Sequence, residues 1–261
     1  MTIGLEAKRS SVISLQGVSK HYGGQAALSP TSLEVPAQHC VALIGPSGCG
    51  KSTLLRLVVG LIAPDGGRVM IAGQEMTDRT KPALRLSMGY IIQDGGLFPH
   101  LTAANNVTLM ARHLGWAAPR LQDRLDELAE LVQLPPALLD RYPSQLSGGQ
   151  RQRVGMMRAL LLDPQVLLMD EPLGALDPII RSQLQQELKL IFQRLRKTVL
   201  VVTHDMGEAA FLGDRIVLMR AGRIVQEGTI RELLEQPADP FVADFIKAQR
   251  PVWPEQLEVK P

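Results

Sequence analysis

A glycine-rich segment that ends in a lysine and a serine is the first part of the sequence that could do chemistry. It occupies residues 45–52, after an apolar run at 41–44 and before a helical pattern at 53–59. Such a loop can surround a phosphate, because its backbone N–H groups are unpaired and the N-terminus of the next helix is electropositive. We expect Lys51 to neutralise phosphate oxygens and the Ser52 hydroxyl to ligate Mg²⁺. The residues predicted to contact the nucleotide are Gly45, Pro46, Ser47, Gly48, Cys49, Gly50, Lys51, Ser52 and Thr53.

Two adjacent carboxylates, Asp170 and Glu171, follow the apolar run at 166–169. Charge at the end of a buried strand is costly unless a cation or a reaction uses it. We expect Asp170 to hold Mg²⁺, through water. Because successive strand side chains alternate, Glu171 should point the other way and polarise an attacking water as general base. Structural alternatives remain for both motifs: a tight glycine turn without a ligand, and a carboxylate pair that caps the next helix.

A second glycine motif, Leu-Ser-Gly-Gly-Gln at residues 146–150, precedes a helical pattern at 151–161. Ser147 and the N–H groups of Gly148 and Gly149 would form another anion site at a helix N-terminus, with Gln150 beside them. Five specified residues match by chance in only about one chain of this length in a few thousand.

Together these motifs resemble those of the ATPase subunits of ABC transporters, whose signature motif reads LSGGQ shortly before an Asp-Glu strand. The resemblance implies that each ATP lies between the phosphate loop of one copy and the signature motif of a second, in a head-to-tail homodimer. It also implies that Lys51, Gln93, Glu171 and His204 are the catalytic residues.

The same resemblance assigns roles to four isolated residues. Tyr22 would stack on adenine, Gln93 would contact the γ-phosphate and Mg²⁺, and His204 would contact the γ-phosphate. Asp177 falls in the D-loop, which bridges the two sites of the dimer. Gly174 departs from the family, in which serine is commoner at this position, and this departure leaves the hydrogen bonding across the dimer open. Considered alone, the tyrosine and the histidine would be ordinary structural residues.

The elements that must position these residues read as an α/β fold. Apolar runs at 41–44, 166–169 and 199–203 predict strands of a parallel sheet covered by helices, one of them at 181–196. Three further strands, at 12–15, 32–35 and 68–72, lack crossover helices and predict an antiparallel sheet.

The helical region at 94–160 contains an apolar stripe formed by Leu121, Leu125, Leu128 and Val132, and Ala221-Gly222 predicts a hairpin turn between residues 216–219 and 223–226. The expected fold is a P-loop NTPase (RecA-like) core with an N-terminal antiparallel β-subdomain and an inserted α-helical subdomain.

We expect one ABC ATPase domain over residues 1–248. Its ATP-binding core and β-subdomain comprise 10–92 and 161–235, and its helical subdomain comprises 93–160. Residues 249–261 read as a loose C-terminal tail, without regulatory CBS domains.

Composition narrows the class of protein. The chain has 261 residues, 45% of them hydrophobic, and a formal net charge of +2. A nearly neutral chain has no strong field for nucleic acid, and we expect it to bind none. No apolar run approaches the roughly 18 residues that span a bilayer, and charged residues occupy the start, where a signal peptide would be apolar. Cys40 and Cys49 are expected to be free thiols in a reducing cytosol.

Softer similarities indicate a subgroup. Five segments look most like the ATPase subunits of importers of glycine betaine, choline and related osmoprotectants: residues 93–102, 106–107, 114–116, 214–230 and 237–246. The resemblance implies a cytoplasmic motor, attached to the inner face of the membrane through permease subunits and served indirectly by a solute-binding protein. The alternatives are an importer ATPase for another small solute, an exporter ATPase, and a soluble ABC protein of cofactor assembly, translation or DNA maintenance.

Overall fold

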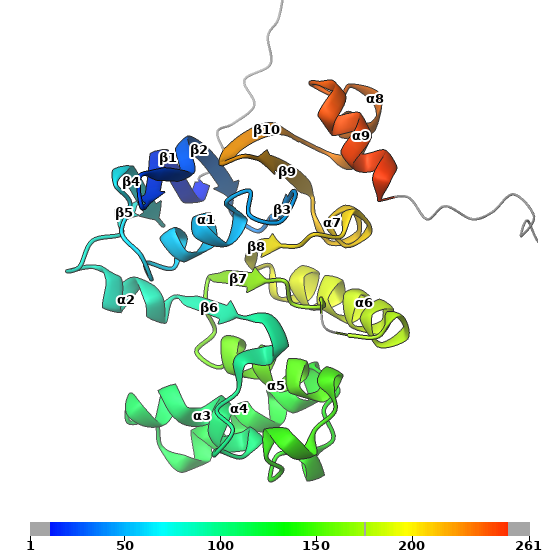
Figure 1. Cartoon of the computed structure of the whole chain (residues 1–261). Helices are drawn as coiled ribbons and strands as arrows, with labels where there is room; N and C mark the ends of the chain where they lie inside the picture. Colours follow the sequence, from blue (N-terminus) through cyan, green and yellow to red (C-terminus); the bar gives the residue numbers. More distant parts are fainter. Residues whose placement is uncertain (1–10, 175, 250–261) are drawn as a thin grey trace, which may run out of the picture.

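A computed structural model of the chain describes residues 11–174 and 176–249 and contains two sheets (Figure 1). The larger sheet has six strands, in the spatial order β10 (Arg223–Gly228), β9 (Arg215–Arg220), β3 (Cys40–Ile44), β8 (Thr198–Val202), β7 (Val166–Asp170) and β6 (Met88–Ile91). All neighbours are parallel except β9 and β10. The predicted parallel strands and the predicted hairpin are confirmed, and Ala221 and Gly222 both adopt positive φ in its turn.

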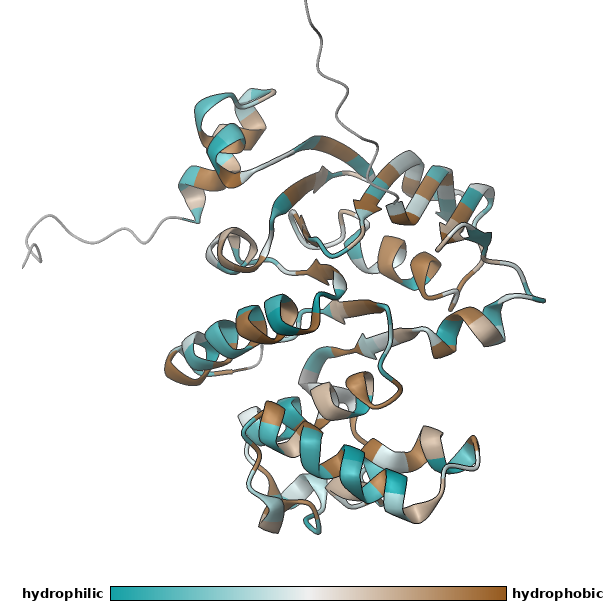
Figure 2. Cartoon of the chain, turned by 180° about the vertical axis from the view of Figure 1, so that it is seen from behind, coloured by the Kyte–Doolittle hydropathy of each residue, from teal (hydrophilic) through white to brown (hydrophobic). Residues whose placement is uncertain are grey.

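The parallel strands are buried on both faces, and their alternate side chains enter two separate cores. Val41 and Leu43 of β3 belong to the core that also contains α1 (Lys51–Val58) and the smaller sheet, whereas Ala42 and Ile44 belong to the core that contains α5 (Gly148–Leu160) and α6 (Pro178–Leu195). Figure 2 shows the central strands as hydrophobic between their covering helices. The helix after the phosphate loop and the helix after the signature motif therefore cover opposite faces of one sheet.

The smaller sheet is antiparallel, as predicted, with the order β2 (Gln25–Pro36), β1 (Ser11–Tyr22), β4 (Gly66–Ile71) and β5 (Gln74–Glu75). Its first two strands are longer than the apolar runs at 12–15 and 32–35 indicate. The register shifts between Leu15 and Val18, where Gly17 has φ +59°, so β1 continues through a bulge and reaches Tyr22.

The predicted helical region contains α3 (Ala103–His113), α4 (Ala118–Leu131) and α5, beyond the β6 edge of the larger sheet (Figure 1). The apolar stripe from Leu121 to Val132 is buried, as predicted. Short 3₁₀ helices connect these elements: η1 (Gln93–Gly96), η2 (Pro136–Leu138) and η3 (Pro143–Gln145). The expected fold class is confirmed, and the subdomain boundaries remain a proposal.

The other helices are α2 (Lys81–Leu86), α7 (Met206–Leu212), α8 (Ile230–Glu235) and α9 (Pro240–Ala248). Helix α6 begins three residues before its predicted start at 181, because the Asp177 side chain accepts hydrogen bonds from the N–H groups of Ile179 and Ile180. Among the described residues, no helix is long and apolar enough to cross a membrane. Cys40 and Cys49 are free, as expected, and both are buried.

Candidate nucleotide-binding site

The phosphate loop joins β3 to α1, and two of its glycines cannot be replaced without displacing a neighbouring carbonyl. Gly45 has φ +151°, and a Cβ on it would lie 2.2 Å from the carbonyl oxygen of Met219. Gly50 has φ +107°, and its Cβ would lie 2.7 Å from the carbonyl oxygen of Ala27. The β9–β10 hairpin also donates a hydrogen bond from Gly222 N–H to Cys49 O at 3.0 Å. The loop is thus shaped by strands far away in the sequence.

The start of α1 suits an anion. In the described structure no side chain caps this helix and no acidic residue lies in its first turn, so neither would compete with an anion for its first N–H groups. The ammonium of Lys51 is buried and donates to the carbonyl oxygens of Gly45 at 2.7 Å and Pro46 at 3.0 Å. A positive group inside the loop, next to an uncapped helix N-terminus, would stabilise a bound phosphate.

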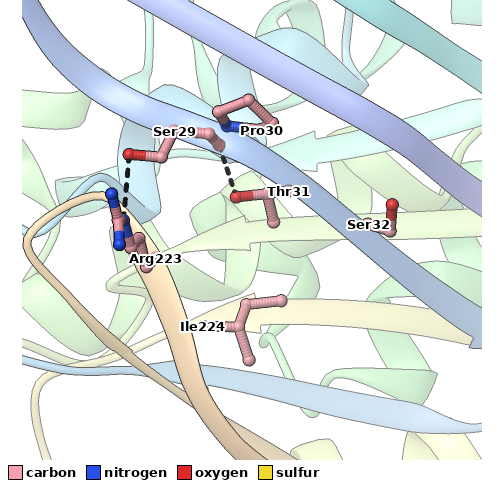
Figure 3. A pocket seen from close by; sticks show the side chains of 6 residues that line it. All are labelled: Ser29, Pro30, Thr31, Ser32, Arg223 and Ile224. Carbon is pink, nitrogen blue, oxygen red and sulfur yellow. Dashed lines mark hydrogen bonds between the residues drawn. The ribbon is translucent and has the colours of Figure 1, made fainter.

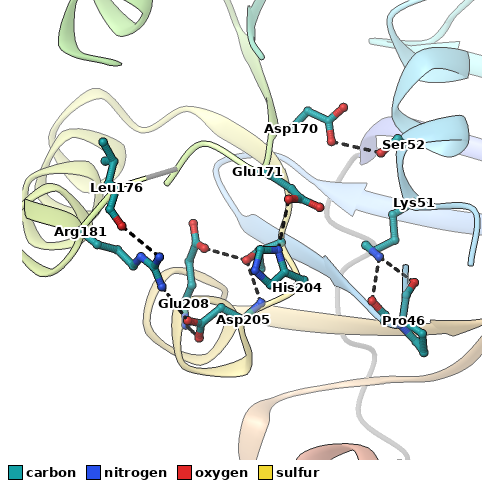
Figure 4. A network of polar contacts seen from close by, with 12 residues as sticks. Pro46, Lys51, Ser52, Asp170, Glu171, Leu176, Arg181, His204, Asp205 and Glu208 are labelled. Atoms are coloured by element: carbon teal, nitrogen blue, oxygen red, sulfur yellow. Dashed lines mark hydrogen bonds and ion pairs between the residues drawn. The ribbon is translucent and has the colours of Figure 1, made fainter. Parts of the chain in front are cut away.

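Ser52 and Asp170 lie together, as a Mg²⁺ site would require. Ser52 Oγ donates to Asp170 Oδ1 at 3.3 Å, and burial of Asp170 raises the pKa of its carboxyl while this hydrogen bond opposes the rise (Figure 4). No group of three or more His, Cys, Asp or Glu side chains among the described residues could hold a metal. A sparse set of oxygen ligands fits Mg²⁺, which keeps several waters and phosphate oxygens in its coordination sphere.

The side chain of Glu171 points away from that of Asp170, but the alternation of side chains along a strand is not the reason. The strand β7 ends at Asp170, and Glu171 has a left-handed backbone, with φ +46°, while its N–H donates to Val202 O at 2.9 Å. A non-glycine residue in this conformation costs of order 1–3 kcal/mol. The turn directs the carboxylate to His204, whose Nδ1 lies 3.1 Å from Glu171 Oε2 (Figure 4).

Sequence reasoning missed the polar contacts behind His204. Thr203 Oγ1 donates to the buried Glu208 Oε2 at 2.6 Å and accepts a hydrogen bond from Asp205 N–H at 3.1 Å. From α6, Arg181 Nη1 lies 3.6 Å from Asp205 Oδ2, and its Nη2 donates to Leu176 O at 3.1 Å. The one local signal was the Asp-x-x-Glu spacing of Asp205 and Glu208, which is typical of a capped helix start.

The signature residues cap their own helix. Ser147 Oγ accepts a hydrogen bond from Gln150 N–H at 3.2 Å, and Gln150 Oε1 accepts one from Ser147 N–H at 2.9 Å. A Cβ on Gly149 would lie 2.9 Å from Ile180 Cγ2, and one on Gly148 would lie 3.2 Å from Leu176 Cδ2. The motif therefore packs against α6 and the D-loop rather than against the phosphate loop of its own chain.

The remaining predicted site residues lie at exposed ends of elements. Tyr22 ends β1 with 49% of its surface exposed, and Gln93 opens η1 and is exposed. The segment after Gln93 is held by α5, because the guanidinium of Arg158 donates to the carbonyl oxygens of Gly96 at 2.7 Å and Gly95 at 2.8 Å. Sequence reasoning did not identify Arg158.

Gly174 lies beside the Glu171–His204 pair. A Cβ on Gly174 would be 3.6 Å from Glu171 Oε2 and 3.7 Å from His204 Cε1, which are ordinary contacts. The structure therefore has space here for the serine that is commoner in the family.

A separate polar hollow of about 390 Å³ lies between β2 and β10 (Figure 3). Several of its polar groups are already hydrogen-bonded: Thr31 Oγ1 donates to Ser29 O at 2.7 Å, and Arg223 Nε donates to Ser29 Oγ at 3.4 Å. It offers no carboxylate or lysine for the chemistry described above.

The sequence is similar to known ATP-binding proteins of transporters. The family described as ABC transporter matches residues 28–174. The chain is 46% identical over 240 residues to the choline transport ATP-binding protein OpuBA of Bacillus subtilis, covering 92% of this chain and 63% of that protein. It is 46% identical over 234 residues to the glycine betaine uptake system ATP-binding protein YehX of Escherichia coli, covering 90% of this chain and 76% of that protein.

Two further relatives differ from these in the transported solute or show a dimer. The sulfate/thiosulfate import ATP-binding protein CysA of Bordetella bronchiseptica is 44% identical over 253 residues, covering 92% of this chain and 71% of that protein. Among solved structures, the dimeric bacterial ABC transporter cassette MJ0796 has a TM-score of 0.77 and 34% identity, covering 84% of this chain and 99% of that one. The chain thus spans less than two thirds of the length of its Bacillus relative and nearly all of a single cassette.

Proposed function

The chain belongs to the ABC transporter family of ATP-binding proteins, as its motifs predict, and from this premise we propose that it hydrolyses MgATP to drive a membrane partner. The observation that carries the proposal is the meeting of the phosphate loop, Asp170 and the Glu171–His204 pair (Figure 4). These groups follow β3, β7 and β8, whose carboxyl ends share one edge of the parallel sheet.

The chain's own groups have distinct tasks in this reaction. Lys51 and the N-terminus of α1 stabilise phosphate charge, and Glu171 accepts the proton of the water that attacks the γ-phosphorus. His204 contacts the γ-phosphate and, through its hydrogen bond, orients Glu171. Ser52, Asp170 and Gln93 would hold Mg²⁺, which supplies further charge neutralisation when bound.

Two copies are needed to complete each site. The signature residues Ser147 to Gln150 are exposed or half-buried and do not pack on their own phosphate loop, so they are free to face the loop of a second copy. Near them Ile179 is 72% exposed, an apolar side chain that a second copy would cover. Asp177 lies at this face, between the two sites, and Tyr22 stacks on the adenine. The support for a dimer is the similarity to a dimeric cassette.

A mixing experiment tests the shared site. Lys51→Ala and Ser147→Arg each abolish hydrolysis alone, but their heterodimer keeps one intact site, so an equal mixture recovers about a quarter of wild-type activity if the sites act independently. The matched control mixes Lys51→Ala with Glu171→Gln. These changes damage the same half-site, so no site in that heterodimer is intact. Equal recovery in both mixtures, or none in either, would contradict the shared site.

The partner is a membrane permease, docked on an apolar hollow of about 610 Å³ beside η1, α2 and α3. Around it Leu61, Phe98, Leu109 and Met110 are 44–54% exposed, which is unusual for large apolar side chains that have no partner. Arg158 also lines this hollow and bonds to the segment after Gln93, so a segment of the permease would act directly on the site. The protein then works on the inner face of the membrane, with a solute-binding protein as an indirect partner.

The solute is a quaternary amine such as glycine betaine or choline, on the strength of the relatives that carry those names. Sulfate is the second candidate, because a sulfate importer subunit is almost as similar. Radiolabelled uptake by the reconstituted complex decides between them. Uptake of sulfate with none of any quaternary amine would reject the substrate class and leave the ATPase intact.

A further inference from the structure

A buried carboxylate with no role in the site described so far lies beneath the loop that carries His204. Glu208, in the first turn of α7, is 3% exposed, and its Oε2 accepts the Thr203 hydroxyl hydrogen bond at 2.6 Å. Its N–H donates to Asp205 Oδ1 at 3.0 Å. Glu208 is thus bonded to the residues on both sides of His204, while His204 itself faces Glu171 (Figure 4).

The Asp205 side chain caps α7 in the usual way, but the Glu208 side chain does not complete a capping box. In a capping box the glutamate side chain would accept the N–H of Asp205, as Glu232 accepts the N–H of Thr229 at the start of α8. Here Asp205 N–H donates to Thr203 Oγ1 instead, and the Glu208 carboxylate reaches past it to Thr203. The carboxylate therefore holds the loop and not the helix end.

Thr203 is the fixed point of the loop. It is 1% exposed, and its N–H donates at 3.1 Å to the carbonyl oxygen of Leu43, on the strand that leads into the phosphate loop. The other oxygen of Glu208, Oε1, is buried and has no hydrogen-bond partner in the described part of the chain. A buried carboxylate with one unpaired oxygen destabilises the folded protein, so its position under this loop suggests a functional role.

We propose that Glu208 is a positioning residue for the hydrolytic reaction, which fixes residues 203–205 so that His204 faces Glu171 and the γ-phosphate. The inference rests on the proposed function. Among the described residues, the hydrogen bond of the His204 ring is the one with Glu171, so loosening Thr203 and Asp205 on either side of it would let the imidazole turn away. A small displacement of this kind is enough to cost about 10²-fold in rate.

The charge on Glu208 matters to this role. The pKa of its carboxyl is raised to about 7, chiefly by burial and in part by the charge of Asp205, while the Thr203 hydrogen bond, Arg181 from α6 and His204 oppose the rise. Burial raises the pKa of the Cys40 thiol on β3, with smaller contributions from the charges of Asp214 and Glu208. Because an ionised carboxylate accepts a stronger hydrogen bond than a neutral acid, Thr203 should be held most firmly above pH 7.

The test is a double-mutant cycle on the full chain, with kcat and KM for ATP measured for Glu208→Ala, His204→Ala and the double variant. Glu208→Ala should lower kcat about 10- to 100-fold while leaving ATP binding nearly unchanged. Adding Glu208→Ala to His204→Ala should change kcat less than about twofold, because the loop then has nothing to position. The matched control is Glu232→Ala, which removes an exposed capping glutamate from α8 and should leave kcat unchanged.

Two outcomes would overturn the proposal. Equal losses from Glu208→Ala in both backgrounds would mean that Glu208 acts independently of His204. If Glu208→Ala does not fold, Glu208→Gln carries the test, since its amide oxygen still accepts from Thr203 but cannot titrate. That variant should lose part of the rise of kcat between pH 6 and pH 8, and an unchanged pH profile would refute the role. Wild-type hydrolysis in His204→Ala and Glu171→Gln would instead reject the proposed function itself.

Discussion

The Glu208→Gln substitution should also reveal how the buried carboxyl affects folding. Burial raises the pKa of Glu208 from its ordinary value of 4.5 to about 7. The folded chain then binds this proton more tightly than the unfolded chain, so the unfolding free energy falls as the pH rises between the two values. Each pKa unit corresponds to about 1.4 kcal/mol, which gives about 3 kcal/mol over the whole range and about 2–3 kcal/mol between pH 5 and pH 8.

The assay is unfolding of the nucleotide-free wild type and of Glu208→Gln, each at pH 5, 6, 7 and 8. An amide has nearly the shape of the acid but does not titrate, so the difference between the two proteins removes the contribution of all other groups. For a chain of this size, the wild type should lose about 5–10 °C more in Tm than the variant on going from pH 5 to pH 8. Parallel pH dependences, or a wild type that gains stability with rising pH, would refute the reasoning.

Three other substitutions each test one residue of the site or of its surroundings. Gly45→Ala should lower the unfolding free energy by about 1–3 kcal/mol, measured by urea titration, because its Cβ would overlap the carbonyl of Met219. Arg158→Ala should lower it by a similar amount, about 2–3 kcal/mol, because two carbonyls lose a charged donor; a neutral result would show that these bonds are solvated. Glu171→Gln should lower hydrolysis by about 10²–10⁴-fold and let ATP trap a dimer on a sizing column; monomer with near-normal turnover would exclude Glu171 as the base.

The sequence predicted the larger elements well because their signals are local. The apolar runs at 41–44 and 166–169 are buried on both faces of the sheet, and such strands read as continuous apolar segments. The bulge at Gly17 was not predicted, because an interrupted alternation reads as the end of a strand. The phosphate loop and the carboxylate pair were also readable, since their residue types and spacing follow from the chemistry of phosphate and Mg²⁺.

What the sequence could not supply is the set of contacts between distant segments. Gly45 must be glycine because a hairpin residue, Met219, places its carbonyl against the loop. The direction of the Glu171 side chain depends on a left-handed turn, which a hydrogen bond to Val202 of β8 stabilises. Strand alternation correctly predicted that the two carboxylates point apart, but it is not the cause. Both effects are set by tertiary packing, which no local pattern encodes.

Glu208 shows most clearly where a local pattern misleads. Three residues after Asp205, it has the spacing of a capping glutamate, and that interpretation would place its side chain in solvent at the helix start. The strand β8 ends directly before Thr203, so the loop to α7 is short and the Thr203 hydroxyl takes the N–H of Asp205. The glutamate then has no N–H left to cap and folds inward onto the hydroxyl. Competition for one N–H group therefore changes a surface cap into a buried support for the loop that carries His204.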